Sequence, residues 1–126
     1  MPDTPKKEAL VRYTDETAPI DCPYGNVKRV VTGGAGGVAN VHIVNVSVGS
    51  LHFHEGYDEV YYVLKGTGKI VMNGVESALR PGAVVVIPAG VPHELAGDNG
   101  QQLEFIIFGS PAMPFSDERA KPRKVN

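Results

Sequence analysis

Three of the four histidines in this sequence stand where their side chains can meet, and they are the residues best suited to chemistry. His52 and His54 are two positions apart in the segment LHFH, and alternate side chains of a β-strand point to the same face. Glu59 begins the next apolar run, after a break at 55–58 where the chain can reverse. His93 follows two prolines that restrict its loop. The spacing therefore predicts one cluster drawn from separate segments.

Such a cluster would supply three neutral imidazoles and one carboxylate. This donor set suits a first-row divalent transition ion, and it leaves open positions if the ion is six-coordinate. Each residue also has an ordinary explanation, since a single strand histidine is usually a plain polar residue. Glu59, which has acidic neighbours, can be a solvated side chain. The coincidence of three histidines and one acid favours the metal site.

Short strands separated by turn residues must position these side chains. The segment 38–48 is rich in β-branched residues and nearly alternating, which makes it the clearest strand. Asn73-Gly74 predicts a tight hairpin, because both central positions of a type I′ turn need positive φ. The predicted strands are 27–31, 38–48, 51–54, 59–65, 69–72, 75–79, 83–88 and 102–108.

The composition favours an all-β fold. Among 126 residues there are 15 Gly and 10 Pro, and stretches typical of helices are scarce. Regularly spaced short strands are typical of a barrel or sandwich. We expect an N-terminal arm at 1–19, one barrel domain at 20–110 and a C-terminal tail at 111–126, where further prolines cannot continue a sheet.

A glycine cluster at 33–37 partly matches a dinucleotide-binding fingerprint. That fingerprint must open a helix after a strand, so that the helix N-terminus faces the pyrophosphate. The residues that follow, VHIVNVSV, alternate like a strand, and the Gly-Lys-Ser/Thr of a phosphate loop is absent. The cluster is therefore predicted to be a turn between two strands.

Charge and composition exclude several classes of protein. The formal net charge is -2, which argues against nucleic acid as a partner. One cysteine allows neither an internal disulfide nor a four-thiolate zinc site. No apolar run approaches the roughly 18 residues of a membrane helix, and the polar N-terminus is unlike a signal peptide. We expect a cytoplasmic protein without membrane partners.

The histidine segment resembles the first signature motif of the cupin family. That motif runs Gly-x5-His-x-His-x3,4-Glu-x6-Gly, and His52, His54, Glu59 and Gly66 match it at the required spacing. The first glycine departs from the pattern, because Gly49 stands three residues before His52 instead of six. This departure puts the local turn in doubt and leaves the ligand positions intact.

The second cupin motif, Gly-x5-Pro-x-Gly-x2-His-x3-Asn, is also present. Its matching residues are Gly82, Pro88, Gly90 and His93, whereas Gly97 replaces the terminal Asn. The resemblance covers about 40–108, and its short inter-motif segment, 67–81, is typical of the small single-domain type. It implies a double-stranded β-helix, or jelly-roll, barrel of two antiparallel sheets. It also implies one divalent metal (Mn, Fe, Ni, Co or Zn, with Mn or Fe favoured) bound by His52, His54, Glu59 and His93.

Two further residues are candidates for the substrate site. Tyr61 shares the face of Glu59, so its phenol can lie near the metal and bind substrate or donate a proton. The alternative is a packed aromatic ring whose hydroxyl reaches the backbone. His42 can line the same cavity and bind substrate, or it can be a buried structural or surface residue. The basic residues at 119–124 are most simply a solvated end.

These features predict a metal-dependent enzyme that acts on a small oxygen-rich or carboxylate substrate. The preferred chemistry is that of a dioxygenase or oxidative decarboxylase. The alternatives are a metal-dependent isomerase or lyase, with proton transfer through Tyr61 or His42, and a non-catalytic small-ligand-binding module. We also expect a homodimer, because strand 59–65 is apolar on both faces and its outer side chains need a cover.

Overall fold

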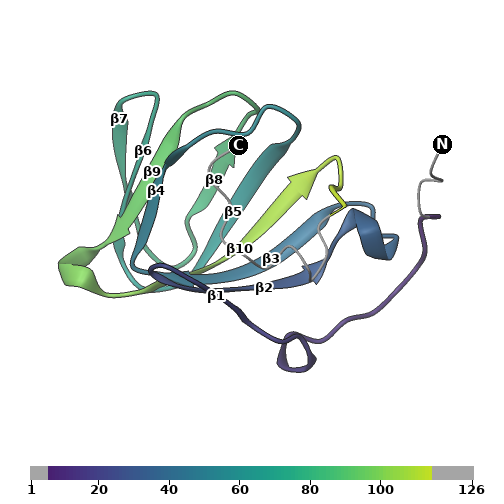
Figure 1. The fold of residues 1–126 in the computed structure, drawn as a ribbon. Helices are drawn as coiled ribbons and strands as arrows, with labels where there is room; N and C mark the ends of the chain where they lie inside the picture. Colours follow the sequence, from purple (N-terminus) through teal and green to yellow (C-terminus); the bar gives the residue numbers. More distant parts are fainter. Residues whose placement is uncertain (1–5, 115–126) are drawn as a thin grey trace.

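The computed structural model describes residues 6–114, which form ten strands in two antiparallel sheets (Figure 1). Across the larger sheet the strands are β1 (Ile20–Cys22), β2 (Gly25–Val31), β3 (Asn40–Val46), β10 (Leu103–Ser110), β5 (Asp58–Lys65) and β8 (Val84–Ile87). Across the smaller sheet they are β4 (Val48–His52), β9 (His93–Gly97), β6 (Gly68–Met72) and β7 (Val75–Leu79). Between residues 6 and 114 the only helical segments are three short 3-10 turns. The expected all-β barrel of two antiparallel sheets is confirmed.

The core lies between the two sheets, which face each other in Figure 1. In β5, Glu59, Tyr61 and Val63 are buried whereas Tyr62 and Leu64 are exposed, so the strand alternates as its sequence predicts. One inward row of the larger sheet joins Val27, Val44, Phe105 and Val63 through successive strand pairs. This apolar row belongs to the core, and the candidate site residues Glu59 and Tyr61 lie in the rows on one side of it.

The segment 38–48, predicted to be one strand, is two. The chain bends at Ser47, whose N–H donates to the carbonyl of Tyr24 and whose carbonyl accepts from the N–H of Gly97. These bonds connect Ser47 to the turn between β1 and β2 in the larger sheet and to β9 in the smaller sheet, so β3 ends in one sheet and β4 begins in the other. The bend matters for function, because it places His42 in the sheet opposite His52, which ends β4.

The structure also contains two strands that the sequence did not predict, β1 and β9. β1 is a three-residue edge strand, and β9 begins at His93 in a segment with little β-branched character. In both segments the pairing partner, and not local composition, makes the strand.

The predicted turns are confirmed. Asn73 and Gly74 have φ values of 50° and 79°, and they connect β6 to β7 as a tight hairpin. The glycine cluster is a 3-10 turn, Gly33–Ala35, followed by Gly36 at φ 87°, and it joins β2 to β3. No helix follows it, so the phosphate-binding alternative is excluded for this segment.

Within the described residues, part of the N-terminal arm lies against this turn, since the N–H of Glu8 donates to the carbonyl of Gly36 at 3.0 Å. No helix found between residues 6 and 114 is long and apolar enough to cross a membrane. The basic cluster at 119–124 lies outside the described residues. The domain boundaries expected at 19/20 and 110/111 stay predictions.

Candidate metal centre

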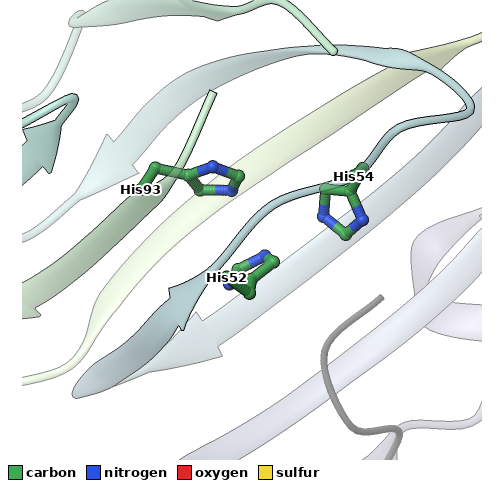
Figure 2. Close-up of side chains that lie close together, drawn as sticks. All are labelled: His52, His54 and His93. Carbon is green, nitrogen blue, oxygen red and sulfur yellow. The ribbon is translucent and has the colours of Figure 1, made fainter. Parts of the chain in front are cut away.

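The three predicted histidines gather at one point between the sheets (Figure 2). His52 ends β4 and His93 begins β9, where the two residues are direct cross-strand partners. Their ring centroids are 4.3 Å apart, and the ring of His54 lies 4.7 Å from His52 and 5.7 Å from His93. One nitrogen from each ring lies within 4.8 Å of the others, so the three imidazoles can hold a metal ion.

His54 reaches the cluster from outside a strand, which differs from the prediction for 51–54. β4 ends at His52, and the pairing with β9 shifts register between Gly49 and His52. The carbonyl of His54 instead accepts a hydrogen bond of 2.6 Å from the N–H of Gly90. This bond ties the first cupin motif to the loop of the second, so the turn around Gly90 helps to place His54.

Hydrogen bonds to the backbone determine which ring nitrogens are available. Nδ1 of His52 lies 2.7 Å from the carbonyl of Ser50, and Nδ1 of His93 lies 2.9 Å from the carbonyl of Val91. A carbonyl only accepts, so both Nδ1 atoms carry the proton and each Nε2 keeps its lone pair. Nε2 of His93 is buried and has no hydrogen-bond partner among the described residues. A buried nitrogen in this state fits a metal ligand.

Tyr57 holds the third imidazole, and the sequence analysis missed it. Its hydroxyl lies 2.8 Å from Nδ1 of His54, and the two rings stack at 4.6 Å with an interplanar angle of 27°. When Nδ1 donates to this oxygen, Nε2 of His54 carries the lone pair that can bind a metal. The only signal in the sequence is an aromatic residue within the break between His54 and Glu59, and nothing local distinguishes it from a turn residue.

Glu59 completes the cluster from the opposite sheet. Its Oε1 lies 3.5 Å from Nε2 of His54 and 3.8 Å from Nε2 of His93, and the residue is 6% exposed. The hydroxyl of Tyr61 donates to the same oxygen at 3.3 Å. Burial raises the pKa of Glu59 to about 7, and the hydrogen bond from Tyr61 partly opposes this shift.

The contacts between Glu59 and the histidines are not ion pairs at neutral pH. Burial, followed by the neighbouring imidazoles, lowers the pKa of His54 to about 4, and burial also lowers the pKa of His93. Both rings are therefore neutral, and their Nε2 lone pairs converge with a carboxylate oxygen. Electron pairs arranged in this way are stabilised by a cation between them, so the donor chemistry fits a divalent ion.

A cavity of about 380 Å³ opens on this cluster. Its wall on the larger sheet includes Tyr61, which is 4% exposed and whose ring stacks on Phe105 at 4.9 Å. Burial, then the adjacent Glu59 carboxylate, raises the pKa of Tyr61 far above its ordinary value. The phenol is therefore a hydrogen-bond and proton donor at neutral pH.

His42 lines the same cavity from β3, as one of its predicted alternatives required. Burial lowers its pKa to about 4, and the charge of Arg29 adds to the effect, so the ring is neutral at pH 7. Arg29 lies directly across the strand pair from His42 and also lines the cavity, yet the sequence analysis did not select it. Its place within VKRVV, next to Lys28, resembles that of any exposed cation on a strand.

Comparisons with known proteins agree with this geometry. The family model described as "Cupin domain" matches residues 41–109. The chain is 38% identical over 60 residues to the oxalate-binding protein of Thermotoga maritima, which covers 48% of this chain and 49% of that protein. It is 30% identical over 76 residues to the uncharacterized protein MJ1618 of Methanocaldococcus jannaschii, which covers 58% of this chain and 59% of that protein. The chain thus spans about half the length of the curated relatives it matches.

Solved structures show the same fold. KdgF from Halomonas sp. superposes with a TM-score of 0.70 at 23% identity, over 88% of this chain and 98% of that chain. At this level of identity the likeness concerns the fold alone.

Proposed function

Because this chain belongs to the cupin domain family, we propose that it is a metal-dependent enzyme acting on a small carboxylate or other oxygen-rich molecule. The preferred chemistry is that of a dioxygenase or oxidative decarboxylase. One observation carries the proposal: three imidazole nitrogens lie within 4.8 Å of one another, and a buried carboxylate faces two of them. These groups line a cavity large enough for a small molecule.

The residues that would hold the ion are His52, His54, His93 and Glu59, with one ion per chain. Mixed nitrogen and oxygen donors suit manganese, iron, cobalt, nickel or zinc, and we favour manganese or iron. When bound, such an ion supplies Lewis-acid activation of a substrate oxygen.

The remaining residues bind, orient and protonate. Tyr61 donates a hydrogen bond to Glu59, and its high pKa keeps the proton available for a substrate oxygen. His42, neutral at pH 7, can donate to or accept from a substrate on the opposite wall. The apolar side chains of Val44, Phe105 and Ile107 limit the water around the reacting groups.

A second candidate is non-catalytic binding of a small carboxylate. The specific observation in its favour is the 38% identity, over 60 residues, to a protein named for binding oxalate. An isomerase or lyase, with proton transfer through Tyr61 or His42, would use the same centre. Turnover separates the binding protein from both enzymes, and dependence on dioxygen distinguishes an oxygenase from an isomerase or lyase.

The test begins with the metal. Wild-type protein, His54→Ala and Glu59→Ala are freed of metal, reloaded with Mn²⁺ or Fe²⁺, and analysed for bound metal. We expect one ion per wild-type chain and a loss of stoichiometry or affinity in both variants. The loaded protein is then screened with small carboxylates, with and without dioxygen. Wild-type metal affinity in His54→Ala, or full turnover in metal-free protein, would contradict the proposal.

We also propose a homodimer formed through the outer face of β8, β5 and β10. This apolar outer face is built by cross-strand neighbours that include Val60, Tyr62, Val84, Val86, Ile106 and Phe108. Val84 and Val86 are 63% and 61% exposed, and no described residue covers them. An apolar face of this kind is typical of an association surface.

Sedimentation at micromolar concentration tests this proposal. We expect a dimer for the wild type and a monomer for Val86→Glu, with Val75→Glu as a matched exposed control on the other sheet. A wild-type monomer would overturn the proposal. The cytoplasmic location stays a prediction.

A further inference from the structure

The cavity has a second polar end on β2 and β3, away from the metal centre. Arg29, His42, Ile107 and Tyr61 form one cross-strand row on the inner face of the larger sheet. Arg29 is three strand spacings from Tyr61, or about 14 Å along the sheet between Cα atoms. Ile107 lies between His42 and Tyr61, so the row has polar residues at both ends and an apolar residue between them. A ligand that fills it needs two polar ends.

Arg29 lines this cavity with an inward strand position, and it also borders a second cavity beside the N-terminal arm. Val27, two residues earlier on β2, packs against the core, so Arg29 has the same inward parity. The pairing of β2 with β3 shifts register between Arg29 and Val31, and such bulges commonly re-aim side chains near a site. Lys28, of opposite parity, instead donates to the carbonyl of Thr14 at 2.8 Å.

The charges favour an anion at this end. Arg29 is the only lysine or arginine among the described residues that line the cavity. A divalent ion at the histidines would be only half neutralised by Glu59, so the occupied cavity would hold excess positive charge. The other acid in the lining, Glu94, is exposed and screened by water.

Asn40 adds an unused donor beside this row. The residue is 2% exposed and lines the cavity, and its Oδ1 accepts from the N–H of Met113 at 2.8 Å. Its Nδ2 is buried without a hydrogen-bond partner between residues 6 and 114. A buried donor in this state is costly, and a ligand oxygen would satisfy it.

From these observations we infer that Arg29 forms a carboxylate subsite, with Asn40 as a further donor on the same wall of the cavity, and that the natural ligand carries one oxygen-rich end for the metal and a separate anionic end for Arg29. This inference rests on the proposed function and adds its substrate class, a dicarboxylate or an oxo acid with a second carboxylate. The guanidinium offers a planar pair of donors that matches a carboxylate. His42 lies beside Arg29 and is neutral, so it can form a hydrogen bond with the ligand carboxylate without changing the net charge of the subsite.

Calorimetry on the full chain loaded with Mn²⁺ tests the subsite. The probes are malonate, succinate and glutarate, each compared with the monocarboxylate of the same carbon number. We expect at least one dicarboxylate to bind wild type more tightly than its monocarboxylate. Arg29→Gln should weaken that dicarboxylate by about 10- to 100-fold, the range for a charge-assisted hydrogen bond, and change monocarboxylate and Mn²⁺ affinity by less than about twofold.

Two variants serve as controls. Lys28→Gln removes the same charge from the neighbouring position and should leave every affinity unchanged. Arg29→Lys keeps the charge but loses the planar pair of guanidinium donors, so it should bind the dicarboxylate more tightly than Arg29→Gln and less tightly than wild type. It also reports on the site if Arg29→Gln folds poorly. Equal losses for di- and monocarboxylates, or no loss in either Arg29 variant, would overturn the inference.

The same titrations on metal-free protein distinguish the two proposals. If wild type binds no Mn²⁺, the proposed function fails. The subsite still predicts that metal-free wild type binds dicarboxylates weakly and that this binding depends on Arg29. If metal-free wild type shows no such binding, the subsite is refuted independently.

Discussion

Replacing Tyr57 with phenylalanine isolates the contribution of one hydroxyl to metal binding. The substitution keeps the ring that stacks on His54 at 4.6 Å and removes only the oxygen that lies 2.8 Å from Nδ1. Without this partner, His54 loses the group that holds its ring orientation and tautomer. Loss of such an outer partner typically lowers metal affinity by about 10- to 100-fold.

The consequence can be followed as a change in stability. At a free metal concentration 100 times the wild-type Kd, binding stabilises the folded state by about 2.7 kcal/mol. If the Kd of Tyr57→Phe is about 30-fold higher, the same concentration stabilises it by only about 0.9 kcal/mol. Urea unfolding with and without Mn²⁺ measures both values, and calorimetry gives the Kd directly.

Tyr62→Phe is the matched control. Tyr62 is exposed on the outer face of β5, so this substitution removes a hydroxyl that lies away from the metal centre. It should show the wild-type metal stabilisation. If Tyr57→Phe folds normally and its Kd for Mn²⁺ is within about twofold of the wild-type value, the proposed role of Tyr57 in orienting His54 is refuted.

Three further predictions follow from burial and protonation. Tyr61→Phe should lower kcat while metal stays bound, because the phenol supplies the proton; an unchanged kcat on a substrate found by screening would exclude that role. His42 takes its proton near pH 6.5 when unfolded and near pH 4 when folded, so it lowers stability as the pH falls across this window, by up to about 3 kcal/mol. Urea unfolding between pH 7 and 4 should show a shallower decline for His42→Gln, and parallel curves would refute the assignment. Leu103 is 0% exposed, so Leu103→Ala should lower the free energy of unfolding by about 2–5 kcal/mol. Leu51 is 58% exposed, so Leu51→Ala should lower it far less in the same assay.

The sequence by itself determined the local features of this protein. The alternation of β5 places Glu59 and Tyr61 on one inner face, because successive strand side chains point to opposite sides. The hairpin at Asn73-Gly74 follows from the positive φ that its turn requires. The two motifs identified the family and the four candidate ligands, since their residue types and spacing are specific.

Only the tertiary structure decided how distant segments meet. The bend at Ser47 moves the chain between sheets, so His42 faces the histidines across the cavity instead of lying beside them. Tyr57 and Arg29 gain their places through a ring contact and a strand pairing that no local pattern encodes. The physical reason is that local periodicity determines which face a side chain occupies, whereas strand register and barrel closure determine what lies opposite that face.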